Sequence, residues 1–443
     1  MEKVQLSKFI EKVFETPGDL CEWFGYYNYD TLSSDHTKML CNRAKFDGVK
    51  IEKGMTIELG YFDLASGKWH HIGESDSFNW QQGAMMQWIP GDNNERRVIY
   101  NVSDEGHLIS KIYDINTGET KKLNWAIYGI TPDGQYSIAL NMERAYWCRA
   151  YHYESVANPE YNVRVAKGDG VYRIDLNNNT RELIIPIEDV VKLEPEENFD
   201  NLKHWLEHVM INQAGTKIVF LHRYSPEYDT YQYQTRMCLA NIDGTGLQVI
   251  SDKSKYDWSH FGWQGDNFAI YTVLNNKLAS SYKGLGKNST NQHPLKKMIF
   301  STALLVKKYL PSRLRKKLKG NNSGYQYYIQ SEDGRYILKD NWQQPFFNID
   351  GHPSFTPDGR YMITDSYPDG KQMQRLVVYD TVTKKGIIVA RLFAALKGTP
   401  ASCDLHPKLS RDGQYVVVDT AYTGTHKMIV FKLNWNLIKQ EIS

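Results

Sequence analysis

Two segments of the chain carry a histidine in the same local context. Both "DGHPSFTPDGRYMITDSYPDG" (350–370) and "CDLHPKLSRDGQYVVVD" (403–419) contain an acid, a His-Pro pair, an Asp-Gly turn and a β-branched run. These segments supply His352 and His406, and His260 in "DWSHFGW" also stands just before a strand-like stretch. The repetition predicts either three side chains that meet at one point or loop histidines copied by duplication.

A metal centre is the chemistry that such a meeting would favour. Three imidazoles from His260, His352 and His406 would be joined by Cys403 or its neighbour Asp404 as a fourth ligand. Imidazoles with a thiolate or carboxylate suit a divalent transition metal such as zinc or manganese. No compact CxxC or HExxH motif is present, so this prediction depends on the fold that brings the residues together.

Other residues have the types needed for acid–base chemistry on a sugar acid. β-Elimination from a uronate needs a cation beside the carboxylate, a base for the adjacent proton and an acid for the leaving oxygen. Arg binds a carboxylate bidentately, neutral His suits the base, and Tyr can serve as the acid. An obvious pair of carboxylates, which a standard glycosidase would need, is missing. The candidates are His204, His208, Arg144, Arg149, Tyr151, Tyr153, Arg223 and Tyr224.

These candidates also have a structural interpretation. They lie in "NMERAYWCRAYHYE" (141–154), "KHWLEHVMINQAGTK" (203–217) and "FLHRY" (220–224), where they would equally line a sugar-stacking groove or fill walls between repeats. Gln81 and Gln82 in "NWQQGAMMQWIPGDNN" (79–94) allow the same two interpretations. Their amides would hydrogen-bond a glycan or satisfy backbone groups between repeats.

The composition limits the class of protein. The chain has 443 residues, 13% of them aromatic, and a net charge of only +2, which favours a β-rich globular protein and gives no case for nucleic-acid binding. The N-terminal stretch has no apolar signal region, and no segment is apolar enough to span a bilayer. Five scattered cysteines indicate reduced thiols. We therefore expect a cytoplasmic protein.

A recurring turn-and-strand unit must position the candidate residues. Asp-Gly turns in "TPDGQYSIAL" (131–140), "TPDGRYMITD" (356–365) and "SRDGQYVVVD" (410–419) precede strand-like runs. Their spacing predicts an all-β fold, a single seven-bladed β-propeller, rather than a stacked sandwich. The expected blades are 20–75, 76–123, 124–190, 198–251, 252–340, 341–394 and 396–437, after a short N-terminal helix within 4–16. Loops before the innermost strands converge on the channel, so His260, His352 and His406 would meet there.

A basic insertion interrupts the fifth predicted blade. Residues 285–322 include nine Lys/Arg and no acid between Lys296 and Lys319, together with an apolar run. A partly helical segment of this kind, 294–319, would lie on an anionic membrane surface. A docking helix for an acidic partner and a solvated loop are the alternatives.

Several of these strings resemble the blade motifs of propeller polysaccharide lyases, with the oligogalacturonate and ulvan lyases as the nearest families. The resemblance is carried by "NWQQGAMMQW", "HWLEHVMINQAGTKIVFLHRY" and the two His-Pro segments. It implies His208 or His204 as the base, Tyr151 or Tyr153 as the acid, and Arg149 or Arg223 as the carboxylate clamp. It also implies a metal held by His260, His352 and His406, with Cys403 as a possible fourth ligand.

The resemblance implies a lyase that cleaves a uronate-containing glycan by β-elimination. The missing export signal favours a role on short oligosaccharides inside the cell or within a surface-polysaccharide pathway. Its partner would be an acidic oligo- or polysaccharide, bound in part by Arg144, Gln81, Gln82 and Tyr224. Two alternatives remain open. One is a non-catalytic propeller that binds glycan or protein at the cytoplasmic membrane, and the other is a glycan-active enzyme of another reaction type.

Overall fold

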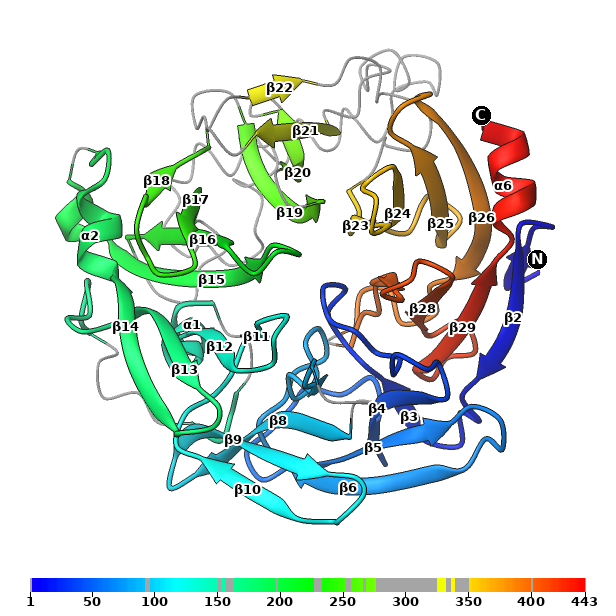
Figure 1. Cartoon of the computed structure of the whole chain (residues 1–443), viewed down its shortest axis with the longest axis horizontal. Helices are drawn as coiled ribbons and strands as arrows, with labels where there is room; N and C mark the ends of the chain where they lie inside the picture. The colour runs from blue at the N-terminus through cyan, green and yellow to red at the C-terminus, as the bar shows by residue number, and fades with distance from the viewer. Residues whose placement is uncertain are drawn as a thin grey trace, which may run out of the picture.

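The computed structural model places seven antiparallel sheets around a central axis, like the blades of a propeller (Figure 1). This confirms the all-β propeller fold that the repeats predict. The structure describes residues 2–91, 96–149, 153–156, 162–196, 198–226, 233–251, 256–265, 268–275, 325–331, 336–338, 350–399 and 401–442. The basic insertion at 285–322 lies outside the described residues.

Each sheet is antiparallel, and in five of the seven a strand of two or three residues lies nearest the axis, whereas β15 and β19, the inner strands of the fourth and fifth sheets, have nine residues each. The first three sheets are β3 (Cys21–Trp23), β4 (Lys38–Ala44), β5 (Ile57–Asp63) and β6 (Trp69–Ser75); β7 (Gln87–Trp88), β8 (Arg97–Asp104), β9 (His107–Asp114) and β10 (Thr120–Leu123); and β11 (Gly129–Ile130), β12 (Tyr136–Leu140), β13 (Gly170–Asp175) and β14 (Thr180–Pro186). The fourth and fifth are β15 (Lys203–Ile211), β16 (Lys217–Ser225), β17 (Gln234–Asn241) and β18 (Gln248–Val249); and β19 (Tyr256–Gln264), β20 (Phe268–Asn275), β21 (Tyr325–Ser331) and β22 (Tyr336–Leu338). The last two are β23 (Ser354–Phe355), β24 (Tyr361–Asp365), β25 (Met373–Asp380), β26 (Lys385–Phe393) and β1 (Val4–Leu6); and β27 (Lys408–Leu409), β28 (Tyr415–Thr420), β29 (Lys427–Leu433) and β2 (Ile10–Glu15).

The Asp-Gly turns join the innermost strand of a blade to the second. In the turn between β23 and β24, Thr356 donates its hydroxyl to Asp358 at 2.6 Å, and Asp358 accepts the Arg360 N–H at 3.0 Å. Gly359 follows with φ of +68°, a left-handed conformation that glycine adopts without steric cost. The local sequence therefore fixes each tight hairpin.

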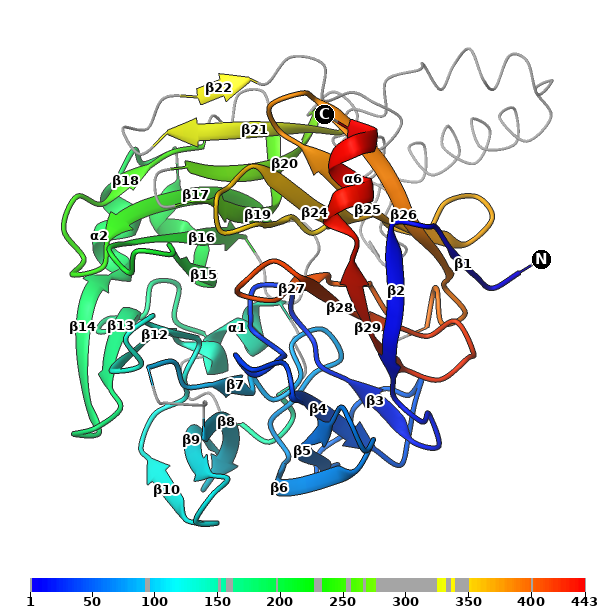
Figure 2. The same cartoon turned by 45° about the vertical axis from the view of Figure 1, so that its right-hand side comes forward.

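The expected N-terminal helix within 4–16 is wrong, because this segment forms two strands. β2 pairs with β29, with Ile10 opposite Leu433, and β1 pairs with β26 at the edge of the neighbouring blade. Figure 2 shows β2 beside β29. An unpaired edge offers a row of backbone hydrogen bonds, and pairing with it outweighs a weak helical preference. The two ends of the chain thus close the ring together.

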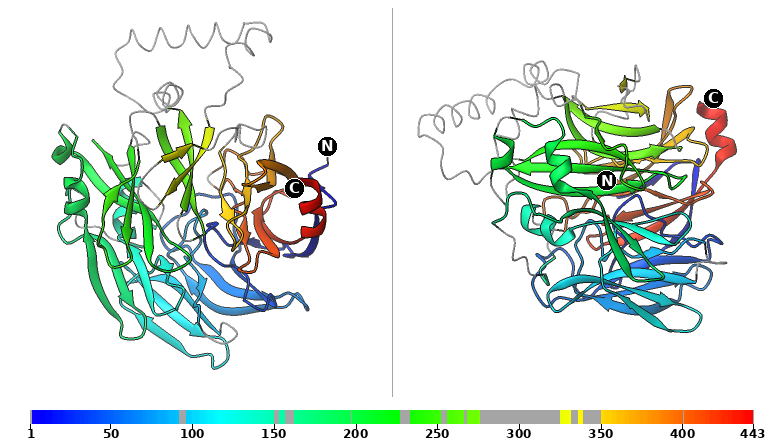
Figure 3. Two further views of the ribbon diagram at one scale, coloured as in Figure 1. Left: turned by 45° about the horizontal axis from the view of Figure 1, so that its top comes forward. Right: turned by 60° about the vertical axis from the view of Figure 1, so that its left-hand side comes forward.

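Helices are few in the part of the chain that the structure describes. They include α1 (Met142–Arg149), which leads from β12 toward β13, α2 (Ile187–Lys192), and α6 (Trp435–Ile442), which packs near β26. Figure 3 shows α6 at the outer edge of the ring. Among the described residues, no helix is long and apolar enough to cross a membrane.

Polar side chains on the second strands fix the loops of the following blade. Asp419 on β28 accepts the N–H groups of Phe24 and Gly25 at 3.1 and 2.8 Å. Asp365 on β24 accepts the N–H of His406 at 3.1 Å. These buried bonds hold the loops that enter the channel, and the candidate site is built on these loops.

Candidate active site and metal centre

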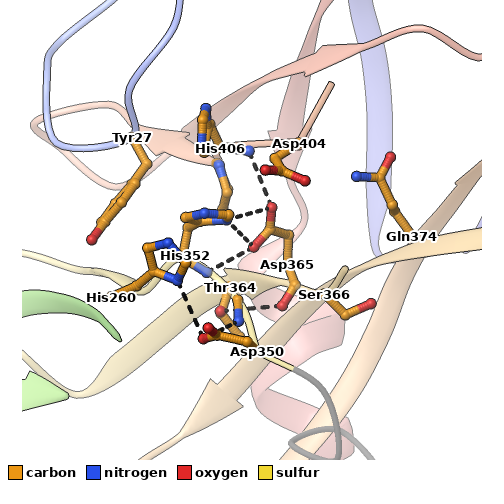
Figure 4. Close-up of polar contacts among 12 residues, drawn as sticks. Tyr27, His260, Asp350, His352, Thr364, Asp365, Ser366, Gln374, Asp404 and His406 are labelled. Carbon is orange, nitrogen blue, oxygen red and sulfur yellow. Dashed lines mark hydrogen bonds and ion pairs between the residues drawn. The ribbon is translucent and has the colours of Figure 1, made fainter. Parts of the chain in front are cut away.

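The structure brings His260, His352 and His406 together at the central channel (Figure 4). The ring centroids of His260 and His352 lie 4.1 Å apart, and those of His352 and His406 lie 4.3 Å apart. His352 and His406 are almost fully buried, at 1% and 3% exposure. The two His-Pro segments therefore meet, and His260 from another blade joins them.

A hydrogen-bond acceptor orients each of these three rings through its Nδ1 atom. Nδ1 of His260 lies 3.2 Å from Asp350, and Nδ1 of His352 lies 2.9 Å from Asp365. Nδ1 of His406 lies 3.0 Å from the carbonyl oxygen of Gly25. Metal-bound histidines in proteins commonly use one nitrogen in this way and present the other to the ion.

Asp404, not Cys403, completes the cluster. Ligand atoms of His352, Asp404 and His406 lie within 4.8 Å of one another. The Cys403 thiol lies 3.7 Å from the carbonyl oxygen of Asp404, and the charges that act on it are chiefly those of Asp419 and Asp404. Of the two alternatives for the fourth ligand, the carboxylate therefore lies beside the histidines, and among the described residues Cys403 does not join that group.

Burial disfavours the charged forms of the groups in the cluster, and nearby carboxylates oppose this effect at one histidine. Burial lowers the pKa of His406 well below its usual value and also lowers the pKa of His260. Burial raises the pKa of Asp404 to about 7, and the nearby carboxylates add to this shift. Burial opposes the charged form of His352, but Asp365 outweighs it and raises the pKa of that ring. A divalent cation would supply the missing positive charge.

His208, the candidate base, stands beside the cluster on β15. Its ring stacks on Tyr26 with centroids 5.0 Å apart and planes 7° apart, and Tyr26 also contacts His406 edge-on at 5.3 Å. His208 and His406 have φ of +53° and +43°. Such values are rare outside glycine and occur at functional sites where the surroundings enforce them.

A chain of hydrogen bonds links Tyr153 to His208. The Tyr153 hydroxyl donates to the Gln82 amide oxygen at 3.0 Å, and the Gln82 amide nitrogen donates to the Tyr128 hydroxyl at 3.1 Å. The Tyr128 oxygen lies 3.1 Å from Nδ1 of His208. Gln82 and Tyr153, both predicted as site residues, are therefore linked through Tyr128 to His208, the candidate base.

Other predicted residues have structural roles instead. His204 uses both ring nitrogens, on His222 at 2.9 Å and on the carbonyl oxygen of Phe199 at 2.9 Å, and its pKa is lowered to about 4 chiefly by burial. Arg144 donates to three backbone carbonyl groups: those of His204, Val163 and Arg164. These bonds engage both ring nitrogens of His204, whereas Arg144 keeps one buried guanidinium nitrogen, Nη1, without a hydrogen bond to the described residues.

Arg223 and Tyr224 alternate along β16 and face different surroundings. Arg223 pairs with Glu207 at 2.5 Å, so a buried carboxylate already neutralises the predicted clamp. Tyr224 donates its hydroxyl to Glu196 at 2.8 Å and packs on Phe199, away from the channel. The substrate-binding prediction for Tyr224 is corrected on this ground.

Three predicted residues remain to be placed. Gln81 is exposed next to Gln82, and its N–H is bonded to Asn79 at 3.0 Å. Tyr151 lies outside the described residues. Arg149 ends α1, and the structure does not describe its side chain.

Sequence analysis missed the residues that orient the histidines. They are Gly25, Tyr26, Tyr128, Glu207, Asp350 and Asp365. Tyr128 had a usable signal, because it directly precedes the innermost strand β11, as the histidines precede β23 and β27. Asp365 had another, because it ends the run after the Asp-Gly turn and has a counterpart in Asp419.

The channel continues below the cluster as a cavity of about 470 Å³. Its walls include Tyr27, Val209 and Pro353, which lie next to the site histidines in space or sequence, and at its far end Asp30 pairs with Arg411. The Tyr27 hydroxyl donates to the carbonyl oxygen of Phe261 at 2.7 Å and accepts its N–H at 3.2 Å. Tyr27 therefore forms a fixed floor between the cluster and this cavity.

Two solved structures of similar fold match nearly the whole chain. An oligogalacturonate lyase in complex with manganese has a TM-score of 0.61 and 16% identity, over 97% of this chain and 95% of that one. The oligogalacturonate lyase of Vibrio parahaemolyticus has a TM-score of 0.58 and 15% identity, over 97% and 96%. At such identities the similarity shows the propeller fold. No protein-family model matches the sequence, and a search of curated proteins found no match.

The residues present fit a divalent metal. Donor atoms of His352, Asp404 and His406 lie close enough together to share an ion, and the ring of His260 stands beside that of His352. The Nδ1 atoms of all three rings are engaged, which leaves Nε2 to face an ion. Nitrogen and oxygen donors of this kind suit manganese or zinc. The polar groups around the donors, Asp350 and Asp365, provide the outer hydrogen bonds that such sites use.

Proposed function

We propose that the protein is a lyase that cleaves a uronate-containing oligo- or polysaccharide by β-elimination. The observation that carries the proposal is the meeting of His260, His352, His406 and Asp404 at the channel, one aromatic ring away from His208. The two structural neighbours named as oligogalacturonate lyases support it. An acidic glycan is the proposed partner.

His208 is the proposed base because it combines an enforced backbone with a hydrogen-bonded ring. Its imidazole is held by Tyr128 on one side and stacked on Tyr26. A neutral imidazole in this position is the final acceptor of the proton beside the substrate carboxylate, whether it takes that proton directly or through the Tyr128 hydroxyl. Tyr153 is the candidate acid among the described residues, since burial raises its pKa and keeps the phenol protonated.

Asp404 and the three histidines are the proposed holders of a divalent ion. When bound, such an ion acts as a Lewis acid that stabilises negative charge on an oxygen. Gly25, Asp350 and Asp365 keep the imidazoles in place through their Nδ1 atoms. A divalent ion held there would supply the positive charge beside the substrate carboxylate, because the charge of Arg223 is already paired with Glu207.

The proposal is tested by absorbance near 235 nm during incubation with polyuronates, because elimination creates a conjugated unsaturated uronate. We expect a rise with the unaltered protein and none with a His208→Ala variant. Absence of any rise on a range of uronates would sink the lyase proposal.

A non-catalytic glycan-binding propeller is the second candidate. It is favoured by the burial of His208 and Tyr153, at 6% and 1% exposure, and by the pairing of Arg223 with Glu207. Binding of a uronate oligosaccharide without an absorbance change, measured by calorimetry, would support this alternative.

A further inference from the structure

Protein groups approach both ring nitrogens of His208. The Tyr128 hydroxyl lies 3.1 Å from Nδ1, and the Glu207 carboxylate lies 3.5 Å from Nε2. All three residues are at least nine-tenths buried. The candidate base therefore has a hydrogen-bond partner at Nδ1 and a carboxylate near Nε2, and the position of its ring hydrogen decides how it acts.

The hydrogen bonds of Gln82 indicate which atom donates in the bond between Tyr128 and Nδ1 of His208. The Gln82 amide oxygen accepts from the Tyr153 hydroxyl at 3.0 Å and from the Asn79 amide at 3.2 Å, so its nitrogen is the atom that faces Tyr128. A phenol oxygen that accepts this N–H has its own hydrogen to donate. Tyr29 also hydrogen-bonds this phenol, so the hydrogen has two possible acceptors. When it is donated to Nδ1 of His208, 3.1 Å away, that nitrogen carries a lone pair.

The charge of the Glu207 carboxylate, 3.5 Å from Nε2, influences which nitrogen carries the ring hydrogen. Its two oxygens accept from the Trp205 indole and the Arg223 guanidinium, both at 2.5 Å, and the pairing with Arg223 favours an ionised carboxylate. A carboxylate beside a ring nitrogen favours a hydrogen on that nitrogen. The neutral His208 ring therefore carries its hydrogen on Nε2, toward Glu207.

The backbone of β15 makes this juxtaposition possible. In a regular strand, Glu207 and His208 would point to opposite faces of the sheet. The register of β15 against β16 shifts between Glu207 and Met210, and His208 has φ of +53°. The bulge turns both side chains into one cavity wall, shared with Tyr128, Gln82 and Tyr153.

We propose that Tyr128 is the residue that takes the substrate proton, with His208 as its proton acceptor and Glu207 as a positioning residue. This inference rests on the proposed lyase function. The Tyr128 O–H bond breaks and its proton forms a bond to Nδ1 of His208. The phenolate oxygen then takes the proton from the carbon beside the substrate carboxylate, and the electron pair of that C–H bond forms the new double bond. The bond to the glycosidic oxygen breaks, and this oxygen leaves with a proton from Tyr153, the candidate acid. Glu207 stabilises the imidazolium, and Gln82 stabilises the phenolate.

The test reads the tautomer of His208 directly, by nitrogen NMR on protein labelled with 15N-histidine. The signal is assigned by its loss in a His208→Gln variant. We expect Nε2 protonated and Nδ1 a hydrogen-bond acceptor in the unaltered protein, with the Nδ1 signal moving in Tyr128→Phe. Tyr224→Phe, which removes a buried hydroxyl bonded to Glu196, is the matched control and leaves the signal in place. A hydrogen on Nδ1 in the unaltered protein overturns the relay, whether or not either variant folds.

Kinetics separate failure of the relay from failure of the lyase function. We expect Tyr128→Phe to lower kcat about 100-fold or more, and Glu207→Gln about tenfold or more, with little change in KM. An active protein whose Tyr128→Phe variant keeps its kcat overturns the relay and leaves the lyase proposal intact. A protein inactive on every uronate overturns the catalytic assignment of Tyr128, while the tautomer still reports the hydrogen-bond chain.

Discussion

Asp365 holds His352 through three contacts at once. Its carboxylate accepts the His352 backbone N–H at 2.7 Å, and its two oxygens lie 2.9 and 3.0 Å from Nδ1 of the ring. Because it also accepts the His406 N–H, one side chain orients both His-Pro segments. The geometry of the candidate metal site therefore depends on a residue that is not itself a proposed ligand.

An Asp365→Asn variant should bind metal more weakly. The amide keeps the shape but loses the charge that holds His352, and such outer-sphere changes typically lower metal affinity about 10–100-fold. Titration with manganese or zinc followed by calorimetry measures the effect. Asp358→Asn, in the exposed hairpin turn, is the matched control and should bind as the unaltered protein does. Equal affinities for Asp365→Asn and the control would contradict the assigned role.

Removing both His-Pro histidines should abolish metal binding. His352 and His406 supply two of the four proposed ligands, and two ligands alone hold an ion poorly. The metal content of a purified His352→Ala/His406→Ala double variant is compared with that of the unaltered protein by elemental analysis. Unchanged content would remove both residues from the ligand set.

A Glu207→Ala variant should be less stable by about 3–5 kcal/mol, because it leaves the buried Arg223 guanidinium without its counter-charge. Urea unfolding measures the free energy. Arg173→Ala breaks an ion pair of similar length between Arg173 and Glu182, but both side chains are exposed, and the cost should stay below about 1 kcal/mol. Similar losses in both variants would show that the Glu207–Arg223 pair is not buried as described.

Truncation at the N-terminus should reveal which strand closes the ring. Removing 2–16 deletes β2 and leaves β29 as an unpaired edge, whereas removing 2–7 deletes only β1, the added fifth strand of its sheet. We expect a large drop in Tm for the longer truncation and a small one for the shorter. Equal values of Tm would argue against ring closure by β2.

The basic insertion remains a prediction from the sequence, and deleting 294–319 tests it. We expect the unaltered protein to co-sediment with vesicles that contain anionic lipid and to be released by salt, because screening weakens charge attraction. The deletion variant should stay in the supernatant, and vesicles of neutral lipid alone serve as the control. Co-sedimentation of the deletion variant would rule out the insertion as the membrane contact.

The propeller could be predicted from the sequence because the turns that define each blade are encoded by neighbouring residues. Each Asp-Gly turn fixes a hairpin between adjacent residues, and repetition of the turn implies repetition of the blade. The N-terminal strands carry no comparable signal, since the partner of β2 is β29 at the other end of the chain. Only the closed ring reveals that pairing.

The sequence predicted those site residues whose position is set by their place in a blade, just before an inner strand. His352 and His406 stand before equivalent inner strands, and the structure brings them together. The choice between His204 and His208 was not available from sequence, because residues four apart share a face of a regular strand. The bulge after Glu207 changes that relationship. Asp350 and Asp365 act through contacts between blades, which spacing along the chain does not show.

The lyase activity itself is tested most directly by absorbance near 235 nm. The unaltered protein, supplied with manganese, is incubated with oligogalacturonate and with other uronate-containing glycans. The proposal predicts a steady rise on at least one of them and no rise with His208→Ala. No rise on any uronate, with glycan binding retained in calorimetry, would contradict the lyase and leave a binding propeller.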